Sequence, residues 1–322
     1  MILVTGGLGF IGPHVARALL DAGEGCVLTR RESSRVPAFI ADELGERLLI
    51  EQLDLVDEGD LLDLGRRHNI TGIVHLAAGG FDGVSPLEYV SRSSQMLFGL
   101  LDAAQRWSVK RVCLASTIGV YAGAVGAPGA IGEDTPIPLA ATAALSIPTV
   151  KRSGELLASF VGAHSDLEVV NMRFSAIWGP LGRTRSPFFA APALIHAAAR
   201  GDAPDLLDRQ QNGFAGDATD LCYVKDCARA VALLQTTARL HHATYNVAAG
   251  RATANAELLA AIADLEPDHS VTLPPGRDPS GPGHDMWLDI SRLQNDTGYV
   301  PEYSAGRAAG DYVAWLKAGN DR

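Results

Sequence analysis

The first twelve residues constrain the fold of this chain more than any other segment. Met1–Val4 is an apolar run typical of a buried strand, and it leads into Gly6, Gly9 and Gly12, where an amphipathic helical pattern begins. Glycines at this spacing allow a tight turn, close approach of a ligand to the backbone, and close packing of helix and strand. The free N–H groups and the dipole at the start of the helix attract an anion. The segment therefore predicts a site for the pyrophosphate of a dinucleotide.

Strand-like and helix-like segments alternate through the first half of the chain. The apolar runs that we interpret as strands are Met1–Val4, Cys26–Leu28, Arg47–Leu53, Gly72–Leu76, Arg111–Ala115 and Leu167–Met172. The amphipathic stretches between them lie near residues 11–22, 57–68, 86–107 and 150–163. This alternation predicts a parallel sheet covered by helices on both faces. Right-handed crossovers make it a doubly wound, Rossmann-type α/β sheet, whose ligands bind at the carboxyl ends of the strands.

The pattern changes after about Gly179. Helical segments near 187–200, 224–238, 254–264 and 305–318 are separated by loops rich in proline and glycine, and strand candidates such as Thr244–Val247 are short. We expect a dinucleotide-binding domain over residues 1–178 and a smaller α/β lobe over residues 179–322 that binds the substrate. Some segments of this second part are expected to return to the sheet.

Composition narrows the classes of partner. The formal net charge of −10 argues against nucleic-acid binding, which usually requires a basic face. No apolar run reaches the roughly 18 residues that cross a membrane, and the N-terminus has no signal-peptide pattern. The four cysteines, Cys26, Cys113, Cys222 and Cys227, lack the spacing of a zinc site. We therefore expect a cytoplasmic protein with buried free thiols, no metal site and a small-molecule substrate.

Eight segments resemble motifs of the extended short-chain dehydrogenase/reductases, the epimerase/dehydratase group, in the order in which that family has them. They are Thr5–Gly12 (TGGLGFIG), Leu53–Leu55, His75–Ala78 (HLAA), Ala115–Tyr121 (ASTIGVY), Glu133–Pro136, Arg173 with Trp178–Pro180, Tyr223–Asp226, and Tyr245–Ala248. The resemblance covers nearly the whole chain. It implies the Rossmann fold and hydride transfer to or from a nicotinamide cofactor. It also implies a homodimer formed by the helices near 86–107 and 150–163.

The resemblance carries over a set of cofactor-binding positions. In this chain they are Gly6, Gly9, Phe10, Ile11, Gly12, Asp54, Leu55, Leu76, Ala77, Ala78 and Lys151. In the family, a tyrosine four residues before the lysine acts as the general base, and the lysine lowers the pKa of that tyrosine and binds the nicotinamide ribose. With Lys151 at the lysine position, the tyrosine position holds Ile147, which cannot exchange a proton.

The missing tyrosine leaves three hypotheses open. In the first, the protein is an oxidoreductase in which Thr117 polarises a carbonyl and Tyr121 or a water chain moves the proton. Asp82 and Glu133 are further ionisable residues for that role. In the second, the cleft carries out an elimination, cyclisation or isomerisation without net redox change. In the third, the protein binds or senses a nucleotide with little turnover. The retained Lys151 favours the first two.

The end of the second predicted strand indicates which dinucleotide binds. Arg30 stands where NAD-dependent enzymes place the carboxylate that accepts from the ribose 2′-hydroxyl, and Arg31, Ser33, Ser34 and Arg35 follow. A carboxylate would repel a 2′-phosphate, whereas guanidinium groups pair with it through charge-assisted hydrogen bonds. An ordinary basic loop is the alternative explanation. The sequence therefore predicts NADP(H) in preference to NAD.

Two positions weaken the assignment of a nucleotide-sugar substrate. The family usually carries a diphosphate-binding arginine at the position of Thr219 and often an asparagine at the position of Ala176. Arg183, Arg185 and Arg277 are other cations available for an anionic group. A smaller compound with a carbonyl or hydroxyl group is at least as compatible with these residues.

Overall fold

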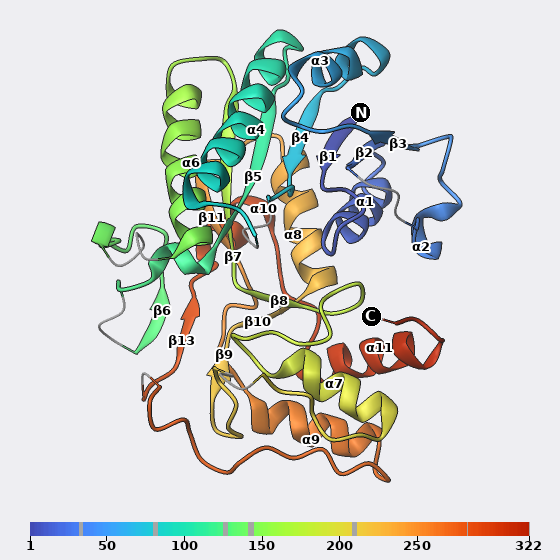
Figure 1. Ribbon diagram of the computed structural model, residues 1–322, viewed down its shortest axis with the longest axis vertical. Helices are drawn as coiled ribbons and strands as arrows, with labels where there is room; N and C mark the ends of the chain where they lie inside the picture. The colour runs from blue at the N-terminus through green and yellow to red at the C-terminus, as the bar shows by residue number, and fades with distance from the viewer. Residues whose placement is uncertain are drawn as a thin grey trace.

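A seven-stranded parallel sheet forms the main body of the molecule (Figure 1). The computed structural model describes residues 1–31, 35–79, 83–124, 128–140, 145–207, 211–281 and 283–321. In spatial order β11-β7-β5-β4-β1-β2-β3, the strands are Thr244–Val247, Glu168–Phe174, Arg111–Thr117, Gly72–His75, Ile2–Thr5, Cys26–Arg30 and Leu48–Gln52. The chain builds β2 and β3 on one side of β1 and then crosses to build β4 on the other. This reversal confirms the predicted doubly wound sheet and marks its ligand crevice.

Several strands continue past their predicted ends. β2 reaches Arg30, β5 reaches Thr117 and β7 reaches Phe174. The prediction followed the apolar runs, but the backbone ladder continues through polar residues, as where Ser116 pairs with Arg173. These extensions matter because they carry polar side chains to the carboxyl edge of the sheet, where ligands of this fold bind.

Helices cover both faces of the sheet, and alternating strand residues fill the two cores. Leu3 of β1 packs with α3, α4 and α6, whereas its neighbour Val4 packs with α1 and α8. This is the period-two alternation of a strand buried on both sides. The covering helices are α1 (Gly12–Asp21), α3 (Glu58–Arg67), α4 (Pro86–Arg106), α6 (Ser146–Ala163), α8 (Val224–Thr236) and α10 (Ser291–Thr297).

Proline residues fix where two helices begin. α6 starts at Ser146 rather than near 150, with Pro148 in its first turn, where no intrahelical hydrogen bond is lost. α7 spans Ala191–Arg200, so its predicted start at 187 was wrong. A helix from 187 would place Pro192 in its second turn, where the missing N–H breaks the ladder. The observed start puts this proline at the helix N-terminus.

The smaller lobe packs beside the carboxyl edge of the sheet and has a core of its own (Figure 1). α7 lies there with α9 (Asn255–Leu265) and α11 (Ala305–Lys317). Two pairs of short strands complete it, namely β8 (Ala176–Trp178) with β10 (Leu221–Tyr223), and β9 (Ala218–Thr219) with β12 (Thr253–Ala254). The sequence did not predict these pairs because two or three residues are too few to show a period.

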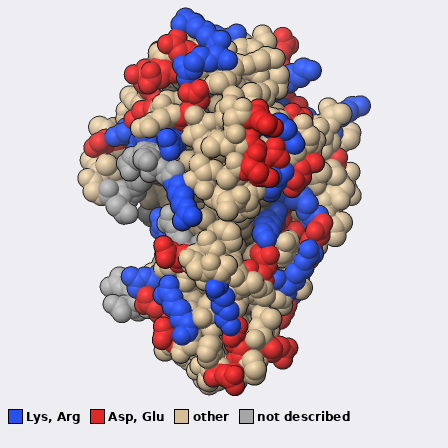
Figure 2. Space-filling model, turned by 90° about the vertical axis from the view of Figure 1, so that its right-hand side faces the viewer, with Lys and Arg blue, Asp and Glu red and all other residues tan. Residues whose placement is uncertain are grey.

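Some segments from the second half of the chain belong to the sheet rather than to the lobe. β11 pairs with β7, and α8 packs against α1 and β5. Three other short elements are α2 (Ala38–Ala41), the 3-10 turn η1 (Ile118–Tyr121) and the pair β6 (Gly129–Ile131) with β13 (Met286–Leu288). The outline of the molecule is notched where sheet and lobe meet, and acidic and basic side chains are interspersed over the face shown (Figure 2).

The four cysteines are buried and unpaired, which confirms the predicted free thiols. In the part of the chain that the structure describes, no helix combines the length and apolar character needed to cross a membrane.

Candidate functional site

The glycine turn after β1 has no room for side chains. A Cβ atom on Gly12 would lie 2.6 Å from the carbonyl oxygens of Gly6 and Gly7. Gly6 has a φ angle of +66°, and a Cβ atom there would lie 3.0 Å from the backbone of Ala77. Within the described residues, no side chain caps the start of α1, which leaves its first N–H groups available to an anion. The turn therefore fits a pyrophosphate at the start of α1.

The loop after β4 lies against this turn and is held by two side chains. Thr5 Oγ1 lies 2.7 Å from His75 Nδ1 and accepts a hydrogen bond of 3.3 Å from the N–H of Ala77. Burial lowers the pKa of His75 to about 3, so its imidazole stays neutral. The predicted cofactor residues Leu76, Ala77 and Ala78 are thereby placed directly beside Gly6.

The other predicted cofactor positions are spread along the same edge of the sheet. Arg30 is half-buried at the end of β2, and Arg31 and Arg35 are exposed. Ser33 and Ser34 lie outside the described residues. Asp54 accepts a 3.2 Å hydrogen bond from the N–H of Val56 and lies 3.8 Å from Arg92 of α4.

Three more predicted cofactor positions have other surroundings. Leu55 is buried in the core under α3 and α4. Phe10 lies against the turn at Gly182, where a Cβ atom would meet its ring at 3.0 Å. Ile11 is the residue that precedes the first turn of α1 and packs partly against the core.

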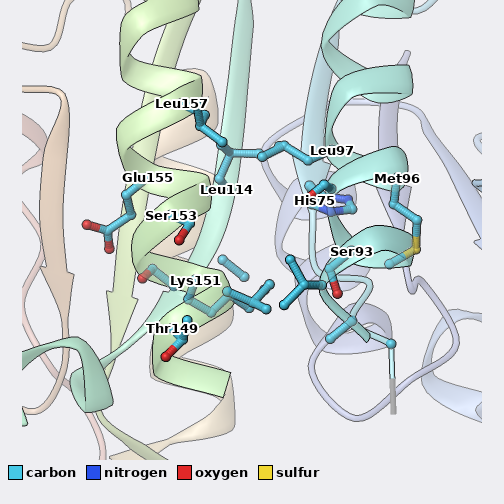
Figure 3. Close-up of a pocket in the computed structure, with 18 of the residues that line it drawn as sticks. His75, Ser93, Met96, Leu97, Leu114, Thr149, Lys151, Ser153, Glu155 and Leu157 are labelled. Atoms are coloured by element: carbon cyan, nitrogen blue, oxygen red, sulfur yellow. The ribbon is translucent and has the colours of Figure 1, made fainter. Parts of the chain in front are cut away.

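A pocket opens between α4 and α6 above the carboxyl halves of β4 and β5 (Figure 3). Most of its lining is apolar, and Leu97 of α4 faces Leu157 of α6 across it. Ala77 and Ala78 form part of the wall, so the pocket continues from the glycine turn. Its polar and titratable lining residues are His75, Tyr89, Ser93, Ser94, Ser116, Thr149, Lys151, Ser153, Glu155 and Asn171.

Lys151 extends from α6 into this pocket (Figure 3). Burial lowers the pKa of its ammonium group to about 8, and the charge of Glu155 opposes that shift only in part. Glu155 points away from the pocket and binds Arg173 with an Nη2 to Oε2 distance of 2.8 Å. No hydrogen bond or ion pair joins Lys151 to another described residue. The structure thus places one poorly solvated amine in the pocket that adjoins the glycine turn.

Ile147 occupies the first turn of α6, one turn before Lys151. Its side chain is 51% exposed and is not part of the pocket wall. The start of the helix is nevertheless anchored, because Pro148 packs against Gly119, where a Cβ atom would lie 2.8 Å from the proline ring. The start of the helix at Ile147 is therefore anchored, and this side chain carries no group that exchanges a proton.

The hydroxyl in the pocket wall belongs to Ser116 rather than to the predicted Thr117. Successive strand residues face opposite sides of a sheet, and Ser116 is on the side of α4 and α6. Thr117 Oγ1 accepts a 3.1 Å hydrogen bond from the N–H of Gly119 and caps η1. Among the described residues, the buried Ser116 Oγ has no hydrogen-bond partner. Counting the alternation from the apolar Leu114 would have found Ser116 from the sequence.

Asn171 of β7 is a second polar residue that sequence reasoning missed. It is buried, and its Nδ2 donates a 3.0 Å hydrogen bond to Ser159 Oγ of α6. Its Oδ1 has no partner within the described part of the chain. The sequence carries no signal for this residue, because it lies inside an apolar strand pattern.

The catalytic role predicted for Tyr121 is contradicted by its surroundings. The side chain is 1% exposed, and its hydroxyl donates to Asn246 Oδ1 and accepts from Arg173 Nη1, both at 2.8 Å. Burial also raises the pKa of this phenol. Glu133 is engaged similarly, since its Oε1 accepts a 2.8 Å hydrogen bond from the N–H of Asn246. Asp82, the other alternative, lies outside the described residues.

Two of the three arginines proposed for an anionic group are bound to aspartates. Arg185 lies 3.1 Å from Asp205, and Arg277 lies 2.6 Å from Asp285. Arg183 is exposed in the loop before α7. Thr219 pairs with Thr253 in the small β9–β12 sheet.

The chain matches the model of the NAD dependent epimerase/dehydratase family over residues 2–248. It is 28% identical to the UDP-glucose 4-epimerase of Azospirillum brasilense, over 94% of this chain and 87% of that protein. It is 27% identical to a dTDP-glucose 4,6-dehydratase of an Actinoplanes species, over 98% of each chain. The solved structure of MoeE5 in complex with UDP-glucuronic acid and NAD is 26% identical, covers 99% of each chain and gives a TM-score of 0.75. These similarities confirm the resemblance drawn from the motifs.

Proposed function

The chain belongs to the NAD dependent epimerase/dehydratase family, and from that premise we propose that it is an oxidoreductase that uses a nicotinamide dinucleotide. Its substrate is a small molecule or sugar derivative with a hydroxyl or carbonyl group. One observation carries the proposal, namely the continuity between the glycine turn and the Lys151 pocket through Ala77 and Ala78. A dinucleotide with its pyrophosphate at α1 would reach that pocket with its nicotinamide end.

The residues present fit the cofactor. Gly6, Gly9 and Gly12 permit a turn too tight for side chains, and the start of α1 supplies N–H donors for a pyrophosphate. Lys151 would hold the nicotinamide ribose with its ammonium group. When bound, the nicotinamide ring supplies a hydride acceptor or donor. The apolar wall formed by α4 and α6 would exclude water from the reacting carbon.

We propose a preference for NADP(H) over NAD. Arg30 ends β2 at the position of the usual carboxylate, and Arg31 and Arg35 are exposed beside it. These three arginines provide cations for a 2′-phosphate. The solved structure of MoeE5 is a complex with NAD, so the preference is a proposed departure from that relative.

For the substrate, we propose a hydroxyl or keto compound related to the sugars named for the relatives. The relatives are named for UDP-glucose and dTDP-glucose, or were solved with UDP-glucuronic acid. In this chain Thr219 provides no charge for a diphosphate, and Arg277 is bound to Asp285. A sugar derivative without the nucleotide is therefore compatible with the lobe as well.

We also propose a homodimer formed through α4 and α6. The large apolar side chains exposed on these helices are Leu87, Val90, Phe98, Ile147, Leu156, Leu157 and Phe160. Exposed large apolar side chains on neighbouring helices are typical of an interface. Leu156→Asp should yield a monomer in analytical ultracentrifugation, whereas the matched change Phe188→Asp on the lobe should leave the dimer intact. A monomeric wild type would overturn this proposal.

Parallel calorimetric titration of cofactor-free protein with NADPH and NADH tests the proposed function. Tight binding of NADPH with weak binding of NADH is the expected result. A following screen of hydroxyl and carbonyl compounds, including UDP-sugars, should show net change in cofactor absorbance at 340 nm. Product formed without net change in the cofactor would indicate an isomerase, elimination or cyclisation instead. Binding of cofactor with no turnover would indicate a sensor, and binding of neither dinucleotide would overturn the proposal.

A further inference from the structure

The pocket beside the glycine turn needs a group that moves a proton, and position 147 does not supply one. In the described part of the chain, four titratable side chains line the pocket: His75, Tyr89, Lys151 and Glu155. They come from β4, α4 and α6, the elements that enclose it. Their surroundings differ, and the differences show which of the four can exchange a proton with a ligand.

Two of the four side chains already bind other residues of the protein. His75 is bound to Thr5 at 2.7 Å, and its low pKa keeps it neutral at any pH at which the protein functions. Glu155 accepts from Arg173 through both carboxylate oxygens, and its side chain points away from the pocket (Figure 3). Neither group is placed to exchange a proton with a ligand.

The other two are Tyr89 and Lys151. Tyr89 is buried on α4, and burial raises the pKa of its phenol, which disfavours the phenolate that a base requires. Lys151 extends into the pocket and makes no hydrogen bond or ion pair with the described residues. The carboxylate whose charge opposes the lowering of its pKa, Glu155, is bound to Arg173. A lysine in such surroundings loses its proton much more easily than one in water, and its pKa falls to about 8.

We propose that Lys151 itself is the general acid and base of this site, in the role that the tyrosine at position 147 would otherwise fill. In the oxidation direction, the substrate O–H bond breaks and its proton passes to the neutral amine of Lys151, which becomes an ammonium ion. The hydride on the same carbon passes to the oxidised nicotinamide ring, and the C–O bond becomes a carbonyl. Reduction is the reverse, with the ammonium ion as the proton donor. The proposal rests on the proposed function.

The first test measures protonation directly. The chain contains only four lysines, Lys110, Lys151, Lys225 and Lys317, so protein labelled with ¹³C at lysine Cε gives four signals. In the full-length protein saturated with NADPH, one signal should titrate near pH 8 and be absent in Lys151→Arg. Lys225 and Lys317 are each bound to a carboxylate, and the variants Lys225→Arg and Lys317→Arg assign their signals. The absence of a signal that titrates near pH 8 and is lost in Lys151→Arg would overturn the proposal.

The second test separates proton transfer from cofactor binding. Lys151→Arg keeps a cation for the ribose but cannot release a proton, so it should bind NADPH within a few fold of the wild type. Its kcat should fall by about 10²- to 10⁴-fold, the usual loss for a general acid/base. The alkaline limb of the wild-type pH–rate profile should coincide with the lysine titration. Retained kcat in Lys151→Arg would overturn the proposal.

Tyr89→Phe provides the matched control on the opposite wall. If Lys151 moves the proton, this variant should lose far less kcat than Lys151→Arg. A loss of 10²-fold or more in Tyr89→Phe would instead assign the proton to the phenol and overturn the proposal. A wild-type protein that binds no nicotinamide dinucleotide would overturn the proposed function itself, which is a different result from a cofactor-binding enzyme whose Lys151 stays charged.

Discussion

The glycine turn after β1 and the first turn of α6 face the same ligand space, but they differ in which residues of the family motifs they keep. The turn keeps the glycines that its close backbone packing requires, since Cβ atoms on Gly6 and Gly12 would lie 3.0 and 2.6 Å from backbone atoms. α6 keeps its start at Ser146, its Pro148 and its Lys151, but it carries Ile147 where the family has its base. Dinucleotide binding relies on backbone groups, whereas proton transfer relies on one side chain. A chain can therefore lose the side chain that transfers the proton and still keep dinucleotide binding. The two regions should respond independently to mutation.

Gly12→Ala should have the largest effect. The added methyl group would lie 2.6 Å from two carbonyl oxygens, so β1 and α1 must separate and the pyrophosphate site is deformed. We expect loss of measurable NADPH binding and a destabilisation of about 2–3 kcal/mol. Gly132→Ala is the matched control, because a Cβ atom there meets nothing within 4 Å. Calorimetry and urea denaturation measure both effects, and a Gly12→Ala protein that binds NADPH normally would contradict this account of the turn.

Lys151→Met should stabilise the cofactor-free protein. The unfolded chain holds this proton up to pH near 10.5, whereas the folded protein releases it near pH 8. At pH 7 the buried charge therefore costs folding free energy, and replacing it with an apolar side chain of similar length should raise the unfolding free energy by about 2 kcal/mol.

The same linkage fixes the pH dependence of that difference. Between pH 8 and 10.5 the unfolded state binds more protons at this position, so the stability of the wild type should rise relative to Lys151→Met, and the gap should close. Lys317→Met, which removes a lysine paired with Glu266 on the surface, should show no such convergence. Equal stabilities of wild type and Lys151→Met at pH 7 would mean that the lysine is well solvated.

Ile147→Tyr asks whether α6 still accepts the family base. Because Ile147 is half-exposed one turn before Lys151, a tyrosine fits without repacking, and the lysine would lower its pKa. We expect kcat for reduction to rise by about tenfold, with unchanged NADPH affinity. Ile147→Phe supplies the ring without the hydroxyl and should give no gain. Equal effects of the two aromatic variants would show that packing, rather than proton transfer, is responsible.

The sequence predicted the regions that depend on local pattern. The glycine spacing predicted the turn, and the alternation of apolar runs predicted the doubly wound parallel sheet. Both follow from neighbours in the chain, such as Leu3 and Val4 on opposite faces of β1. The spacing of four residues predicted that Ile147 and Lys151 share one helix, and the structure places both on α6, while their roles stay predictions.

Residues whose environment comes from distant segments could not be predicted in this way. Tyr121 is removed from the site by Asn246 and Arg173, which lie 125 and 52 positions away. The unpartnered oxygen of Asn171 is a property of packing between β7 and α6. Thr117 was named because the family motif marks that position, whereas the direction of a side chain depends on where the surrounding helices pack.

The smallest expected effect on stability concerns the neighbouring residues Ser116 and Thr117. Ser116 is buried but its hydroxyl makes no hydrogen bond to the described residues, so Ser116→Ala removes an unsatisfied polar atom and should change stability by less than about 0.5 kcal/mol. Thr117→Ala removes the cap of η1 and should cost about 1 kcal/mol. The order reverses for ligands, because Ser116 lines the pocket and Thr117 does not. Urea denaturation and NADPH titration of both variants measure this reversal, and a Ser116→Ala protein that is the less stable of the two would show that its hydroxyl is bonded in solution.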